Sequence, residues 1–206
     1  MLKTFANSIS AGVLIAIGGS VFLACDNKYI GAVLFSVALL CICYKQYVLF
    51  TGKVGYIVES HKKSDVVALL LGLLGNLITT FALGVLIRTA MPALGEAANT
   101  ICAAKLTQLL PQTLVRALFC GILMYLAVSI FKEHNTIAGI VFCVPVFILS
   151  GFEHSIADMF YFCASGIYTL QVVLFMVTVI IGNSIGGMLL PLLNLIGAEK
   201  SGKKDN

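Results

Sequence analysis

The chain has 206 residues, of which 60% are hydrophobic and only 11% are charged. A soluble globular domain has about 45–50% apolar and about 25% charged residues, so this composition excludes an ordinary soluble domain and indicates a protein that lies in lipid. The formal net charge of +4 does not indicate nucleic-acid binding, because the lysines separate apolar runs and report membrane topology instead. We expect a lipid bilayer, and no nucleic acid, around this chain.

Apolar runs follow one another along the whole chain. A helix needs about 20 apolar residues to cross a bilayer, because each residue adds about 1.5 Å to its length. The first run is too long for a cleaved export signal and lacks a clear small-residue cleavage site. We therefore expect an all-α polytopic membrane protein, with residues 1–206 forming a single transmembrane domain. Its six approximate spans are 5–24, 29–50, 66–86, 113–131, 137–162 and 170–196.

The positive charges predict the orientation of these spans. If the six spans alternate in direction, one side of the membrane contains Lys3, Lys53, Lys62, Lys63, Lys132, Lys200, Lys203 and Lys204. The other side receives Lys28, Arg88, Lys105 and Arg116. The positive-inside rule then places both termini in the cytoplasm of a multi-pass inner (plasma) membrane protein. Lys45 falls inside the second span, where a cation must reach an interface, a partner or water.

A Gly-Asn pair occurs in the third span and again in the sixth, as Gly75-Asn76 and Gly182-Asn183. The two pairs hold corresponding positions in the two halves of the chain. Because three spans per half reverse the direction of the second half, a repeat of this kind is inverted across the membrane. Such 3+3 repeats place a transport pathway near the midplane, where the halves meet.

Ionisable residues lie in the middle of the fifth span, as Glu153, His154 and Asp158. At a lipid-exposed helix centre a charged residue costs on the order of 2.5–3.5 kcal/mol, so these side chains must face protein or water. Gly151 predicts a break in the helix just before them. Thr51, followed by a glycine, interrupts the second span in a similar way. Paired interruptions indicate a site where the halves meet, although Thr51 could instead end a helix and His154 could instead tie helices together.

The seven cysteines form no CxxC motif and show no metal-ligand spacing with histidine. Their composition is typical of small apolar filler in helices. We expect no metal site and no cofactor.

Several segments resemble the formate/nitrite transporter family. Ser150–Met159 is similar to its most characteristic segment, in which family members usually have Asn at the position of Asp158. The other similar segments follow in order over nearly the whole chain: Phe35-Ser36 through Leu49-Phe50-Thr51, Gly75-Asn76-Leu77, Lys105 with Arg116 and Leu126-Ala127-Val128, and Gly182-Asn183 with Gly186-Gly187.

The resemblance implies an aquaporin-like protomer of six transmembrane helices, two of them interrupted, assembled as a homopentamer with one pore in each subunit. It assigns His154 to the centre of the pore, Thr51 to the loop that faces it and Lys105 to the extracytoplasmic side. The remaining pore residues that it implies are Phe35 and Phe147 at an outer constriction, Leu39 and Phe50 at an inner one, and Asn183 on the sixth helix.

Some positions depart from the family pattern. Gly121 stands where the fourth helix of family members has Asn, and Val48 stands where they have an acidic residue. The usual amphipathic N-terminal helix does not precede the first span, and the connection between the fourth and fifth helices is short. These departures bear on gating and substrate preference.

The expected function is a channel or transporter, not an enzyme, for a small monovalent anion. Formate is the first candidate, and nitrite or hydrosulfide is the alternative, because the constriction residues carry no information about anion shape. An anion crosses apolar constrictions only at a large desolvation cost, whereas its conjugate acid crosses cheaply. We expect Lys105 to concentrate anions by its field, and His154 to relay a proton or donate an N–H while Thr51 orients the imidazole or the anion. Glu153 could hold a backbone group or Lys45.

Two other classes remain open from sequence. A membrane enzyme could use His154, Glu153 and Asp158 as an acid/base cluster or metal site, although His61 and His134 lie outside the spans. A structural scaffold without a conduit leaves the buried ionisable residues and the paired interruptions unexplained.

Overall fold

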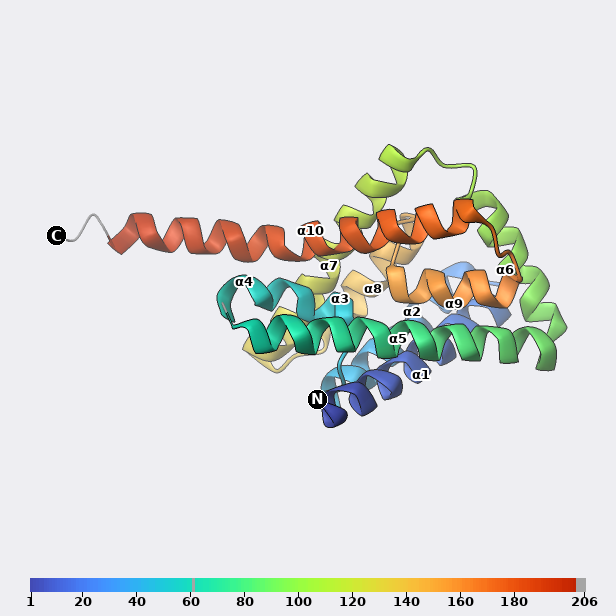
Figure 1. Ribbon diagram of the computed structural model, residues 1–206, viewed down its shortest axis with the longest axis horizontal. Coiled ribbons are helices and arrows are strands. Elements are labelled where there is room, and N and C mark those ends of the chain that lie inside the picture. Colours follow the sequence, from blue (N-terminus) through green and yellow to red (C-terminus); the bar gives the residue numbers. More distant parts are fainter. Residues whose placement is uncertain (61, 203–206) are drawn as a thin grey trace.

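The computed structural model describes residues 1–60 and 62–202, and the elements in this part of the chain are helices connected by short segments (Figure 1). Their bounds are α1 Leu2–Ala24, α2 Lys28–Tyr44, α3 Phe50–Lys53, the 3₁₀ turn η1 Val54–Tyr56, α4 Ile57–Ser60, α5 Lys63–Ala90, α6 Pro92–Lys105, α7 Leu110–His134, α8 Ala138–Leu149, α9 Ser155–Ser165 and α10 Leu170–Gly202.

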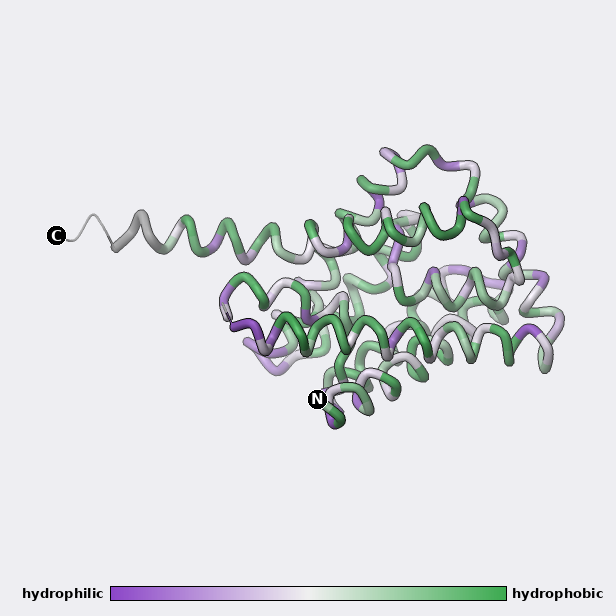
Figure 2. The backbone as a smooth tube through the Cα atoms, viewed as in Figure 1, coloured by the Kyte–Doolittle hydropathy of each residue, from purple (hydrophilic) through white to green (hydrophobic). Residues whose placement is uncertain are grey.

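Four of the helices, α1, α5, α7 and α10, are long and apolar enough to cross a membrane. They contain the first, third, fourth and sixth predicted spans. Along α5, Leu70, Leu74, Ile78 and Phe81 point outward and are each about half exposed. The tube of α5 is mostly green, the colour of hydrophobic residues, in Figure 2. An exposed apolar face of this kind suits lipid or a neighbouring subunit better than water.

The second and fifth predicted spans are both interrupted, as expected. In the fifth, α8 ends at Leu149, and Gly151 has a positive φ of 67° that a helix cannot continue through. In the second, α2 already ends at Tyr44, because Gln46 adopts a left-handed conformation with φ of 55°. The expectation that Thr51 marks the interruption is therefore wrong, since Thr51 lies inside the short helix α3.

This early helix end also answers the question posed by Lys45. The residue caps the end of α2 and is exposed, so its charge reaches the surface. The segment between the third and fourth spans, expected as a plain connection, contains the helix α6. The count of six membrane crossings stays a prediction.

The long helices pack in two pairs, α1 with α5 and α7 with α10, and the second halves of the broken segments lie against them. Glycines allow the close approach of α7 and α10. A Cβ atom at Gly186 would overlap the carbonyl oxygen of Leu118, and one at Gly121 would overlap that of Asn183. Without a hydrophobic driving force between helices in lipid, such close van der Waals contact stabilises the pair. Gly121 is thus a packing position.

The start of α1 and the C-terminal half of α10 lie toward one end of the molecule, and the connection from α5 to α6 lies toward the other (Figure 1). This arrangement agrees with the predicted side of most lysines. The cytoplasmic placement of the termini stays a prediction, and His61, Lys203 and Lys204 lie outside the described residues.

Candidate functional site

Asn183 on α10 holds the break in the fifth span. Its Oδ1 accepts the backbone N–H of Ser155 at 2.9 Å, which is the first N–H of α9. Its Nδ2 donates to the carbonyl oxygens of Glu153 and Ala117, both at 2.8 Å. The N–H of Ser155 and the carbonyl oxygen of Glu153 lie at the break, where helical partners are lost and other partners are needed in a membrane interior. Ala117 lies inside α7, so this third bond ties α10 to α7. Asn183 is completely buried, and its side chain bonds to backbone groups.

Asn76 on α5 makes the same three kinds of contact at the other break. Its Oδ1 accepts the N–H of Phe50, the first of α3, at 2.9 Å. Its Nδ2 donates to the carbonyl oxygens of Val48 at 2.9 Å and Ser8 at 2.7 Å. The asparagines of the two Gly-Asn pairs therefore make equivalent hydrogen bonds in the two halves. Asn76 was missing from the expected site residues although the sequence echo pointed to it, and the full inverted repeat stays a prediction.

The two breaks meet at one side-chain contact, in which Thr51 Oγ1 lies 2.9 Å from Nε2 of His154. Both residues are buried. The other ring nitrogen, Nδ1, accepts the N–H of Ala157 at 3.2 Å and so caps the N-terminus of α9. A nitrogen that accepts carries no proton, so the neutral imidazole has its proton on Nε2 and donates to Thr51. A cationic ring would lose the cap and face the positive end of the helix dipole.

One predicted constriction residue, Phe147, packs directly on this contact. The ring of Phe147 stacks on His154 with centroids 5.5 Å apart and planes at 20°. Phe35 meets Phe147 edge-on at 6.3 Å. Leu39 and Phe50 are buried in the hydrophobic core at 2% and 3% exposure. An aromatic pair, Phe147 and Phe35, thus lies on one side of His154, and the arrangement of all four residues as two constrictions stays a prediction.

A cavity lies on each side of the polar pair. The outer cavity, of about 450 Å³, opens on the side expected to face away from the cytoplasm, and the inner cavity has about 370 Å³. No residue lines both, and neither Thr51 nor Phe50 lines either. The outer cavity includes Phe35, Lys105, Arg116, Phe147, His154 and Asp158 in its wall, and the inner one includes Leu39, Leu49, Gly52, Lys53, Phe131 and Lys132.

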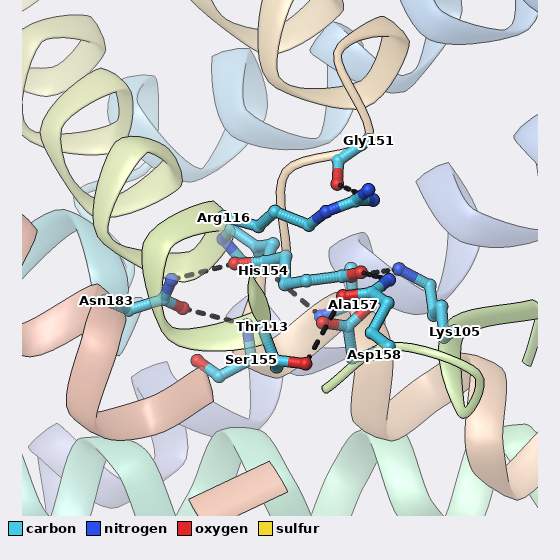
Figure 3. A network of polar contacts seen from close by, with 11 residues as sticks. Lys105, Thr113, Arg116, Gly151, His154, Ser155, Ala157, Asp158 and Asn183 are labelled. Atoms are coloured by element: carbon cyan, nitrogen blue, oxygen red, sulfur yellow. Dashed lines mark hydrogen bonds and ion pairs between the residues drawn. The ribbon is translucent and has the colours of Figure 1, made fainter. Parts of the chain in front are cut away.

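Lys105, at the end of α6, is held by two carboxylates in the wall of the outer cavity. Its Nζ pairs with Oε2 of Glu153 and lies 3.0 Å from Oδ1 of Asp158. Figure 3 shows the side chains of Lys105 and Asp158 pointing toward each other. Gln108 Nε2 donates to Oε1 of Glu153 at 2.7 Å, and Thr113 donates to Gln108 at 3.3 Å. The structure therefore pairs Glu153 with Lys105 and not with Lys45.

This pairing changes the role expected for Lys105. Burial acts to lower the pKa of Lys105, but the carboxylates of Asp158 and Glu153 together outweigh it and raise the pKa above its ordinary value. Lys105 is therefore charged at neutral and mildly alkaline pH, yet two carboxylates facing one ammonium leave no positive excess. Other cations in the outer wall are Lys28 and Arg116, whose Nη1 donates to the carbonyl oxygen of Gly151 at 3.3 Å.

Sequence reasoning missed Gln108 and the two lysines of the inner wall. Gln108 carries no signal beyond lying three residues after Lys105. Lys53 and Lys132 were read as topology markers alone, although both end an apolar segment beside the predicted pore. Lys132 Nζ lies 3.4 Å from the centre of the Tyr56 ring, which holds it at the inner wall. Within the described part of the chain, no three His, Cys, Asp or Glu side chains are grouped as metal ligands.

Known proteins share the sequence pattern and the fold of this chain. The sequence profile described as "Formate/nitrite transporter" matches residues 1–196. A solved structure named "FNT family ion channel" superposes with a TM-score of 0.85 at 22% identity, covering 96% of this chain and 90% of the other. A second, "Pentameric formate channel with formate bound", gives a TM-score of 0.80 at 25% identity, covering 96% and 97%. No curated protein matches. The chain belongs to the formate/nitrite transporter family.

Proposed function

We propose that this protein is a channel for a small monovalent anion, formate foremost, in the plasma membrane. The observation that carries the proposal is the contact between Thr51 and His154, which lies between two separate cavities and within apolar walls. A related solved structure is described as a pentameric formate channel with formate bound, which supports both the anion class and assembly as a homopentamer. In the proposal residues 1–206 form a single six-span domain with both termini in the cytoplasm.

The apolar walls decide in which form the cargo crosses. Phe35 and Phe147 line the outer cavity together with His154, Leu39 lines the inner cavity, and Phe50 is buried next to Thr51 in the chain. Moving an isolated carboxylate into such surroundings is prohibitively costly, so a buried group neutralises instead. A weak-acid anion therefore binds in the outer cavity and passes the walls as its conjugate acid or with a strong hydrogen-bond donor beside it.

His154 supplies that donor. Because Nδ1 is engaged by the N–H of Ala157, the proton of the neutral ring is on Nε2 and faces Thr51. An anion at this point takes the N–H of Nε2, and the Thr51 hydroxyl turns to donate to the anion as well. Of the two roles considered for His154, the hydrogen-bond donor fits these contacts better than an imidazolium relay, which breaks the cap of α9.

The direct test is flux in proteoliposomes that contain the purified protein, comparing formate, nitrite and hydrosulfide over a series of external pH values. We expect saturable flux of all three above that of empty liposomes, with formate the fastest. A different order changes the preferred anion within the proposed class. Absence of flux for every one of the three anions would contradict the channel itself.

A further inference from the structure

The cluster around Lys105 contains one carboxylate more than it contains cations. Glu153 uses both of its oxygens, Oε2 toward Lys105 and Oε1 toward Gln108. Asp158 uses only Oδ1, which lies 3.0 Å from the same ammonium. Its Oδ2 is buried and has no hydrogen-bond partner in the structure. The uncompensated negative charge of the cluster is therefore assigned to Oδ2 of Asp158.

The surroundings of Asp158 offer little to stabilise a second negative charge. Its side chain is 2% exposed, so water screens it poorly, and an unpaired charge in such a place is strongly disfavoured. The titratable and charged groups around it are Lys105 and Cys102 on α6, Glu153 and His154 in the break, Arg116 and Cys120 on α7, Tyr161 on α9 and, at the far end of α9, Arg88 on α5. Of these, Lys105 makes the ion pair, and it is shared.

We propose that Asp158 is a proton-binding site whose occupancy is linked to the binding of an anion in the outer cavity. With a proton on Oδ2 the three groups Lys105, Glu153 and Asp158 are neutral as a set, and without it they carry one negative charge. Asp158 and His154 line the same cavity, so an anion that approaches His154 is repelled by the second state and not by the first. The inference rests on the proposed anion conduction.

The linkage works in both directions. If a proton on Asp158 strengthens anion binding by some factor, a bound anion strengthens proton binding by the same factor. The anion thus binds in the outer cavity together with a proton on Asp158, which lies about one helical turn after His154. An asparagine at residue 158 would be neutral at every pH, so the expected proton dependence requires the aspartate of this chain.

The experiment compares formate uptake by wild type and Asp158→Asn in proteoliposomes from about pH 5 to about pH 8.5, at constant total formate. Formic acid becomes scarcer for both proteins equally as the pH rises, so the ratio of the two fluxes isolates residue 158. We expect the wild-type flux divided by the Asp158→Asn flux to be near one at the acidic end and to fall about tenfold at the alkaline end, as expected for one unit charge near the anion in a partly buried site.

Asp26→Asn is the matched control. It removes the same charge two residues before Lys28, which lines the outer cavity. Because Asp26 is exposed, salt and water screen its charge, and the wild-type flux divided by the Asp26→Asn flux is expected to stay constant with pH. A flat ratio for Asp158→Asn as well would overturn the linkage.

Infrared difference spectroscopy tests the proton site independently of conduction. We expect the carbonyl stretch of a protonated carboxylic acid in the wild type, its absence in Asp158→Asn, and its growth when formate is added at constant pH. Identical spectra of the two proteins would overturn the proposed site, even if both conduct. Protein that binds the proton but conducts no anion would instead contradict the proposed function.

Discussion

His154 combines a structural and a functional requirement in one imidazole. One nitrogen caps α9 and the other contacts Thr51 of α3, while the ring face packs on Phe147. The two alternatives considered from sequence, a tie between helices and a pore residue, are thus not exclusive for this side chain. A substitution that tests the proposed function must keep the cap.

Replacing His154 by Asn meets this condition, because Asn is among the best residues for capping a helix N-terminus. Its shorter side chain cannot also reach Thr51, so the anion loses a donor in a dry part of the pore. A hydrogen bond to a charged group is worth about 1.5–3 kcal/mol, and we expect formate flux to fall by about ten- to a hundredfold. His134→Asn, at the exposed end of α7, is the control. Flux equal to wild type in His154→Asn would show that the imidazole is not needed.

At this scale the sequence predicted the residues better than their partners. Thr51 and His154 were expected to face each other, and the structure places them in contact. The partners of Lys105 could not be predicted, because α6, the break and α9 contribute them from distant parts of the chain. Which carboxylate approaches an ammonium depends on how these elements pack, and no local pattern encodes that distance.

The broken elements depend on asparagines from unbroken helices. A break frees backbone donors and acceptors, and both Asn76 and Asn183 satisfy one N–H and two carbonyl oxygens. The sequence predicted where α8 ends, since glycine at residue 151 signals a break. It did not predict where α2 ends, because Gln46 is not a residue that usually adopts positive φ and the run around it is largely apolar.

We expect Asn183→Ala to destabilise the protein more than any surface change of the same kind. The N–H of Ser155 and the carbonyl oxygen of Glu153 at the break lose their partner, and each unsatisfied group costs about 1–3 kcal/mol. The bond to Ala117 on α7 is lost as well. Thermal unfolding in detergent should show a marked fall in the midpoint. Asn194→Ala, an exposed position on the same helix, should leave it nearly unchanged. Equal midpoints for the two variants would mean that water or a rearranged backbone replaces the amide.

The outward faces of the whole molecule require a covering. Leu70, Leu74 and Ile78 on α5 are each about half exposed, and a single chain offers no second layer to bury them. The family and the general arrangement of helices were predictable from composition, periodicity and ordered motifs. The extra helix α6 was not, because its segment has the small and polar residues of a connection.

We expect native mass spectrometry of the detergent-solubilised protein to detect five chains of 22.0 kDa as the main species. The apolar faces that do not meet lipid are then buried between subunits. Heating in a denaturing detergent should give the single chain and serves as the control. A main species of one or two chains under gentle conditions would contradict the pentamer.

The two cavities also differ electrically. Lys53 and Lys132 line the inner one, where no acidic residue of the described lining joins them. In the outer one the carboxylates of Glu153 and Asp158 offset part of the charge of Lys28, Lys105 and Arg116. Such a pore rectifies: it cannot alter the equilibrium distribution of the anion, but its two mouths saturate at different concentrations. Efflux and influx under equal and opposite gradients should therefore run at unequal rates, although the protein remains a passive channel.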